Sequence, residues 1–175
     1  MNTDHDDGPA FPAAAAPGEP RPGEVRFAAP VPAYDDAGLV FIGRIRSPWT
    51  DRSACPKNIG AARERGLTAA VEVDAAFRPA LAGLAAGSYV HLLTWLDRAT
   101  RDLALQMPRH ASGPRGTFSL RSPVRPNPIG MHLVRIEAID PEAGILTIDA
   151  IDVLDGTPLL DLKPYLASVD APPAP

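Results

Sequence analysis

A proline-rich segment with two arginines is the strongest candidate for chemistry in the sequence. Residues 116–130 read GTFSLRSPVRPNPIG. The segment contains three prolines within six residues: Pro123, Pro126 and Pro128. Because proline fixes φ, they stiffen a loop that would otherwise be mobile, and Asn127 is held between two of them. Arg121 and Arg125 could therefore bind a carboxylate, a phosphate or a base face from a rigid platform. The alternative is a loop that uses its prolines only to turn a corner.

A second segment groups acids, a lysine and a tyrosine near a turn. Residues 149–165 read DAIDVLDGTPLLDLKPY, in which the DGTP run is typical of a turn. Asp152 and Asp155 lie at the mouth of this turn, and Lys163 and Tyr165 follow close by in the chain. Such groups can perform acid–base chemistry or bind a cationic ligand. A plain hairpin turn with capping residues is the alternative.

Arginine is concentrated in one part of the chain. Between residues 98 and 135, seven arginines stand against one acid, Asp102, which gives a local charge of +6 in a chain of net charge −4. The seven are Arg98, Arg101, Arg109, Arg115, Arg121, Arg125 and Arg135. Clustered positive charge releases counterions from a polyanion, so nucleic acid is the predicted partner. A solvated arginine-rich face is the alternative.

The motifs of several common protein classes are missing from the sequence. It contains no G-x-G-x-x-G, no P-loop and no G-x-S-x-G elbow, which leaves nucleotide folds and serine hydrolysis without support. The four histidines never form a zinc-binding spacing, so no metal is expected. Because Cys55 is the single cysteine of the sequence, an internal disulfide is excluded. Its neighbours in sequence supply no base, so we expect an unreactive loop cysteine.

The apolar spacing predicts a small, mainly β fold. Alternation and short apolar runs predict strands at residues 39–46, 67–74, 89–96, 118–120, 131–139 and 145–151. Residues 142–144 predict a hairpin between the last two strands, and residues 75–86 predict one helix with Asp74 as its N-cap. Because open sheet edges need protection, we expect a closed or nearly closed antiparallel β-barrel with one or two short helices.

The prolines also mark the ends of the folded part. Of the 21 prolines, seven fall in residues 1–37 and three in residues 171–175. The first 37 residues hold nine alanines and seven acids, too few large apolar residues to offset the ordering entropy. We therefore expect a disordered leader at 1–37, a barrel domain at 38–170 and a flexible tail at 171–175. The acidic start does not read as a secretory signal and no apolar run reaches membrane-span length, so we expect a cytoplasmic protein without a membrane partner.

Both segments resemble those of the TsaA-like (YaeB-like) family, which are β-barrel S-adenosylmethionine-dependent tRNA methyltransferases. Three further stretches agree with it: IGRIRSP at 42–48, CPKN at 55–58 and HLLTWLDR at 91–98. The resemblance spans residues 42–166, and RPNPIG followed by DGTPLLDLKPY is a very specific pair. It implies N6-methyl transfer to threonylcarbamoyl-adenosine beside the tRNA anticodon, and a homodimer that forms the cofactor pocket.

The resemblance also assigns candidate residues. The implied cofactor-binding residues are Lys57, Asn58, Asp97, Arg98, Arg121, Met131, Asp149, Ala150, Ile151 and Asp152. Asp97 and Arg98 stand where the family frequently has His-Gln or His-Arg, and Leu120 replaces a threonine before Arg121. The family segment before the proline-rich loop is commonly longer than it is here. The local positive charge makes Arg115 and Arg125 the candidates for binding substrate RNA.

Methyl transfer depends mainly on positioning the methyl donor and the acceptor nitrogen, and it needs little covalent catalysis by the protein. A cationic sulfonium suits nearby carboxylates, and Arg121 could pair with the carboxylate of the cofactor. The acceptor nitrogen must lose a proton, which makes Asp155 a candidate base with Lys163 and Tyr165 polarising the site. Asn127 completes the catalytic candidates.

Two other functions remain open on sequence alone. The same scaffold could methylate a small molecule or another RNA, because the segment before the proline-rich loop, which is commonly longer in the family, differs here. A non-catalytic nucleic-acid-binding barrel would explain the arginines by themselves. That function needs exposed aromatic rings for base stacking, whereas Phe41, Tyr89, Trp95 and Phe118 are expected to be buried in strands.

Overall fold

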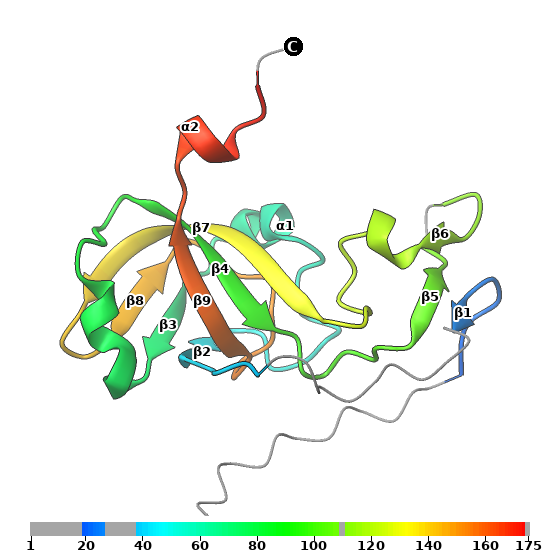
Figure 1. Ribbon diagram of the computed structural model, residues 1–175, viewed down its shortest axis with the longest axis horizontal. Helices are drawn as coiled ribbons and strands as arrows, with labels where there is room; N and C mark the ends of the chain where they lie inside the picture. Colours follow the sequence, from blue (N-terminus) through cyan, green and yellow to red (C-terminus); the bar gives the residue numbers. More distant parts are fainter. Residues whose placement is uncertain (1–18, 27–37, 109–110, 174–175) are drawn as a thin grey trace, which may run out of the picture. The chain divides into compact units, whose positions relative to one another are not determined.

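The computed structural model describes residues 19–26, 38–108 and 111–173, and Figure 1 gives their secondary structure. The chain divides into two compact units. We call residues 38–96 and 127–173 the barrel unit. We call residues 19–26, 97–108 and 111–126 the arginine-rich unit.

The barrel unit is a closed, six-stranded antiparallel β-barrel, which confirms the predicted fold. Its strands follow the order β2-β3-β8-β7-β4-β9 around the barrel (Figure 1). They are β2 (Gly43–Arg46), β3 (Ala69–Val73), β4 (Tyr89–Trp95), β7 (Ile129–Asp140), β8 (Ile145–Ile148) and β9 (Pro158–Pro164). A membrane-crossing helix, which would have to be long and apolar, is absent from the described part of the chain.

Alternation along the strands explains which side chains fill the barrel. In β4, Val90, Leu92 and Thr94 are fully buried, while the residues between them are partly exposed. The other strands contribute buried Ile45, Val71, Val134, Ile136, Leu146, Ile148 and Leu159. Side chains of a strand point alternately to its two faces, and each buried aliphatic side chain contributes about 1.5–3 kcal/mol. The period of two in the sequence therefore produces one continuous core.

The predicted hairpin between β7 and β8 is confirmed. The two strands pair antiparallel, from Asp140 opposite Ile145 to Ile136 opposite Ile148. Gly144 adopts a φ of 73°, a conformation that favours glycine, and Asp140 Oδ1 accepts a hydrogen bond from the Ala143 amide at 3.0 Å. The local residue types thus set the register of this strand pair.

The helices differ from the sequence-based expectation. Residues 75–86 do not form an α-helix: η1 (Ala75–Leu81) is a 3₁₀ helix, and Asp74 makes no side-chain cap hydrogen bond. Pro79 lies inside this segment, where its missing N–H and its ring oppose a longer α-helix. An α-helix instead forms at α1 (Ile59–Glu64), where Asn58 Oδ1 accepts the Ala61 amide hydrogen at 2.9 Å. A short α2 (Ala167–Asp170) follows β9.

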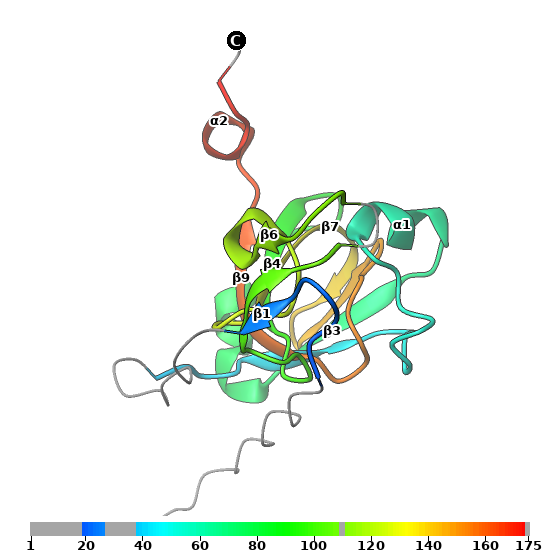
Figure 2. The same ribbon diagram turned by 90° about the vertical axis from the view of Figure 1, so that its right-hand side faces the viewer.

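The arginine-rich unit is a three-stranded antiparallel sheet in the order β1-β5-β6. Its strands are β1 (Val25–Arg26), β5 (Leu103–Gln106) and β6 (Arg115–Gly116), and Figure 2 gives a second view of them. The strand β1 belongs to the segment expected to be a leader. Residues 1–18 and 27–37 of that segment, Arg109, and residues 174–175 of the expected tail lie outside the described residues.

The prediction of a strand at residues 118–120 is wrong. The segment forms η2 (Thr117–Ser119), a 3₁₀ turn whose Leu120 amide donates back to the Thr117 carbonyl at 3.2 Å. Phe118 is 79% exposed in this turn. Tyr89, also expected to be buried, is 44% exposed. The expectation that both aromatic rings are buried in strands is therefore wrong: Phe118 lies in a 3₁₀ turn, and Tyr89, although it begins β4, is exposed.

Candidate functional site

Three polar side chains from separate segments form a chain of hydrogen bonds in the barrel unit. His132 of β7 has its Nδ1 2.6 Å from Asp152 Oδ1 and its Nε2 3.0 Å from Thr94 Oγ1 of β4. A carboxylate can only accept, so Nδ1 carries the ring proton. In the neutral ring, Nε2 then accepts the threonine hydroxyl hydrogen. We call Thr94, His132 and Asp152 the His132 cluster.

Only one member of the His132 cluster reaches the surface. Thr94 is fully buried and His132 is 6% exposed, whereas the side chain of Asp152 is 17% exposed. Gly130 leaves room for the two buried partners, because a Cβ at this position would lie 2.5 Å from His132 Nε2 and still closer to Thr94 Oγ1. The cluster therefore presents one oriented carboxylate from a closely packed polar support.

Sequence reasoning did not find Thr94 or identify this role for His132. The two residues are 38 positions apart in the chain and were not linked by a known motif. One signal was available, because both are polar residues at inward positions of apolar strands, in YVHLLTW and IGMHLV. A buried polar side chain costs free energy unless it is hydrogen-bonded, so two such positions indicate a polar contact inside the barrel.

Cys55 is a partly buried thiol close to this cluster. Burial, and to a smaller extent the negative charge of Asp152, together raise the pKa of the Cys55 thiol to about 11. At neutral pH the thiolate fraction is then about one part in ten thousand, which argues against nucleophilic catalysis by this residue.

We expect Cys55 in the folded protein to react very slowly with iodoacetamide at pH 7. The rate should rise with pH up to about 11, because the thiolate is the reacting species and the raised pKa delays its formation. Mass spectrometry of the alkylated protein measures the rate, and urea-unfolded protein is the control, in which reaction should be fast at pH 8–9. Rapid alkylation of the folded protein at pH 7 would contradict this account.

The helix that follows Lys57 and Asn58 is attached to another predicted cofactor segment. Arg63 of α1 donates from Nε to Asp149 Oδ2 at 2.8 Å and from Nη2 to the Leu133 carbonyl at 2.6 Å. The other oxygen of Asp149 accepts the Arg135 amide hydrogen at 2.8 Å. Both views of the fold show α1 beside β7 (Figures 1 and 2).

Several predicted cofactor residues already have structural roles. Asn58 caps α1 with its side chain, and both carboxylate oxygens of Asp149 are bonded. Ala150 and Ile151 are buried, and the Ile151 carbonyl accepts from Trp49 Nε1 at 2.7 Å. By contrast, Lys57, Asn127 and Met131 are exposed. The two predicted carboxylates of the cofactor site therefore differ: Asp149 is bonded to Arg63, whereas Asp152 is bonded to the buried imidazole of His132.

The structure does not bring Asp155 together with Lys163 and Tyr165 within one chain. Asp155 precedes β9, and its Oδ1 accepts the Ser47 amide hydrogen at 2.9 Å. Lys163 lies near the far end of this seven-residue strand, where it pairs with Asp161 at 2.8 Å, and Tyr165 follows the strand. Since a strand rises about 3.3 Å per residue, β9 separates the two ends by about 20 Å.

The remaining predicted residues belong to the arginine-rich unit. Arg125 is partly buried, and its Nη2 donates to the Leu120 carbonyl at 2.8 Å and to the Thr117 carbonyl at 3.2 Å. This arginine therefore holds the loop around η2, a structural contact that charge counting did not anticipate. Asp97 is partly exposed, and the other predicted arginines of this unit are exposed: Arg98, Arg115 and Arg121. No group of three or more His, Cys, Asp or Glu among the residues described is placed to hold a metal ion.

Proteins of known structure share this barrel. A crystal structure of TrmO is 34% identical, with a TM-score of 0.63 over 78% of this chain and 61% of that chain. The structure of TrmO from Pseudomonas aeruginosa is also 34% identical, with a TM-score of 0.61 over 78% of this chain and 59% of that chain. The chain thus spans about three fifths of the length of these proteins.

Residues 44–171 match the family described as the tRNA-methyltransferase O N-terminal domain, and the chain belongs to this family. The probable S-adenosyl-L-methionine-binding protein VirR of Rhizobium radiobacter is 40% identical over 134 residues, 77% of this chain and 74% of that protein. The tRNA (adenine(37)-N6)-methyltransferase of Eikenella corrodens is 52% identical over 59 residues, 33% of this chain and 34% of that protein. The resemblance found in the sequence is confirmed.

Proposed function

We propose that this protein is an S-adenosylmethionine-dependent methyltransferase that modifies N6 of a tRNA adenosine. The observation that carries the proposal is the family match over residues 44–171, which includes the barrel and both specific sequence segments. Relatives named as S-adenosyl-L-methionine-binding proteins and as tRNA (adenine(37)-N6)-methyltransferases support it. Within tRNA, the proposed acceptor is threonylcarbamoyl-adenosine beside the anticodon.

The residues of the His132 cluster fit a cationic cofactor. S-adenosylmethionine supplies an activated methyl group on a positively charged sulfonium. Asp152 offers a partly exposed carboxylate whose orientation is set by the buried imidazole of His132. The negative charge of Asp152 favours binding of a cation. Pairing of Arg121, in the arginine-rich unit, with the cofactor carboxylate stays a prediction from the resemblance. Binding and orientation are the main contributions that such a transfer requires.

The proposed reaction also requires a base that removes the proton of the acceptor nitrogen. Asp155 stays the candidate base as a prediction. Its Oδ1 accepts a hydrogen bond from the Ser47 amide, and Arg46 lies 4.0 Å from its other oxygen. Lys163 and Tyr165 lie at the other end of β9, so they would serve the same site only if a second chain supplied them. Their catalytic roles, and that of Asn127, stay predictions.

We also propose that the protein is a homodimer and acts in the cytoplasm, where tRNA is present. Exposed apolar side chains on β4 and β7 support the dimer: Tyr89, Ile129 and Met131 are 40–50% exposed. Beyond β9, Leu166 and Val169 are 53% and 74% exposed. Apolar surface of this kind is commonly covered by a second subunit. Sedimentation equilibrium of the full chain measures the oligomeric state directly.

Mass spectrometry of tRNA nucleosides tests the proposed reaction. The full chain is incubated with tRNA and methyl-labelled S-adenosylmethionine, and the digested nucleosides are separated. Label in threonylcarbamoyl-adenosine is the expected result. Label in another nucleoside, or only in an added small molecule, would indicate the alternative acceptors. A protein that binds tRNA but transfers no label would act as a binding module.

A further inference from the structure

Phe118 is the most exposed large apolar side chain in the described part of the chain, with 79% of its surface accessible. It lies in the middle of η2, in the arginine-rich unit. One exposed apolar residue is ordinary on a protein surface and by itself carries no inference. The surroundings of this ring are what make it informative.

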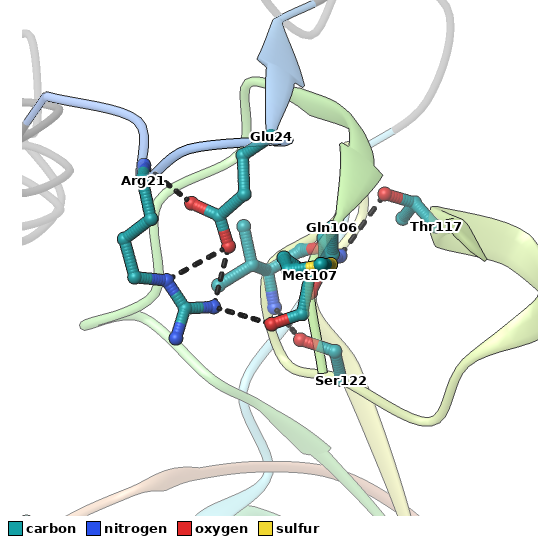
Figure 3. Close-up of polar contacts among 7 residues, drawn as sticks. Arg21, Glu24, Gln106, Met107, Thr117 and Ser122 are labelled. Carbon is teal, nitrogen blue, oxygen red and sulfur yellow. Dashed lines mark hydrogen bonds and ion pairs between the residues drawn. The ribbon is translucent and has the colours of Figure 1, made fainter. Parts of the chain in front are cut away.

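The backbone that precedes Phe118 is fixed by a buried polar network (Figure 3). Thr117 is 2% exposed, and its hydroxyl donates to the Leu103 carbonyl at 2.6 Å. The same hydroxyl accepts from Gln106 Nε2 at 3.0 Å, and Gln106 Nε2 also donates to the Val124 carbonyl at 2.6 Å. Buried hydrogen bonds of this kind hold a single conformation, because breaking them leaves polar groups unpaired.

The turn is also held from its other side. Arg125 Nη2 donates to the carbonyls of Thr117 and Leu120, which flank Phe118. Ser119 Oγ donates to the Gly116 carbonyl at 2.8 Å. In the same loop the hydroxyl of Ser122, which Figure 3 labels, accepts the Val124 amide hydrogen at 3.2 Å. The aromatic ring is therefore displayed to solvent on a backbone whose ordering entropy has already been lost in folding, which favours binding.

The charge around this ring selects the kind of partner. Residues 103–126 contain four arginines and no acid, so the segment attracts a polyanion. Arg115, three positions before Phe118, is exposed. The nearest neighbours in sequence are Thr117 and Ser119, which do not extend an apolar surface for a protein partner. An exposed flat ring with an exposed cation three residues away in the chain suits an unpaired base and its phosphate.

We propose that Phe118 stacks on an unpaired base of the substrate RNA, with Arg115 at an adjacent phosphate. This inference rests on the proposed function and adds the mode of RNA recognition to it. Stacking does not read the base sequence, because every base has a π face. The contact would hold the single-stranded part of the substrate without selecting its sequence.

Titration of the full chain with a fluorescent anticodon stem-loop RNA at two salt concentrations tests this proposal. Phe118→Ala should raise Kd about tenfold and leave the salt slope unchanged, because no phosphate contact is lost. Phe118→Tyr should restore binding. Arg115→Ala should instead reduce the salt slope by about one unit. Val40→Ala, at a side chain that is 66% exposed in the barrel unit, is the matched control and should bind RNA normally.

The outcomes separate this inference from the proposed function. If the unaltered protein methylates tRNA and Phe118→Ala binds the stem-loop as tightly as it does, stacking is overturned and the methyltransferase stands. If Phe118→Ala weakens binding but the unaltered protein transfers no methyl group, stacking is supported and the methyltransferase fails. A change of oligomeric state in Phe118→Ala, seen by sedimentation, would assign the ring to a protein contact and overturn stacking.

Discussion

Asp152→Asn is expected to weaken S-adenosylmethionine binding about a hundredfold while the barrel stays folded. A hydrogen bond or contact involving a charged group contributes about 1.5–3 kcal/mol, and each 1.4 kcal/mol is a factor of ten in Kd. Asparagine keeps the shape of the side chain and can still bond to His132 through either its oxygen or its amide group. The substitution therefore removes the negative charge proposed to face the sulfonium and leaves the polar support in place.

Asp155→Asn is the matched control for this substitution. Asp155 is also a partly exposed carboxylate of the barrel unit, and its bond to the Ser47 amide can be kept by the asparagine oxygen. Calorimetric titration should give a cofactor Kd within about twofold of the unaltered protein for this variant. Its kcat should fall if Asp155 is the base. Equal losses of cofactor affinity in the two variants, with unchanged thermal unfolding, would remove Asp152 from the cofactor site.

Most of the barrel could be predicted because its strands alternate. The β4 and β7 segments were found within two residues of their observed bounds, since inward apolar residues recur at every second position. The strand β9 was missed because PLLDLKP has proline at both ends and directly follows a turn. Both prolines lie at the limits of the strand, where a missing amide hydrogen is tolerated. The turn residues before β9 and its two prolines therefore hide a strand that closes the barrel.

The His132 cluster could not be derived from local patterns, because it depends on the register of β4 against β7. In that register Thr94 lies opposite Gly130 and Leu92 opposite His132. A shift of one residue would turn His132 to the outer face and separate it from Thr94. Sequence shows that polar residues occur at these positions, but only the pairing of distant strands shows that they meet.

Arg125 illustrates a different limit of sequence reasoning. Counting charge identifies a basic segment correctly but does not distinguish an arginine that faces solvent from one that binds carbonyls. Arg125 donates to two carbonyls of its own loop, whereas Arg115 is exposed, and both looked equivalent in the sequence. The carbonyl acceptors belong to η2 and the residue after it, a segment expected to be a strand, so these contacts could not be derived from the sequence. Binding of substrate RNA by Arg125 stays a prediction.

The closure of the barrel depends on a glycine, and Gly43→Ala is expected to lower the free energy of unfolding by about 3 kcal/mol. Gly43 of β2 pairs with Val73 of β3 on one side and with Leu159 of β9 on the other. An added Cβ would overlap the carbonyl oxygen of Glu72 and lie 3.0 Å from the Val73 Cα. These are backbone atoms of a strand that is itself paired with β8, so they cannot move aside without disturbing a second strand pair.

Urea unfolding followed by circular dichroism measures this effect, and Gly38→Ala is the matched control. A Cβ at Gly38 meets no atom within 4 Å, so that variant should unfold within about 0.5 kcal/mol of the unaltered protein. Natural domains are stable by only about 5–15 kcal/mol, so a loss of 3 kcal/mol shifts the urea midpoint by about 1–3 M. If Gly43→Ala unfolds at the same urea concentration as Gly38→Ala, the strands β2 and β3 are not held as closely as the barrel geometry requires.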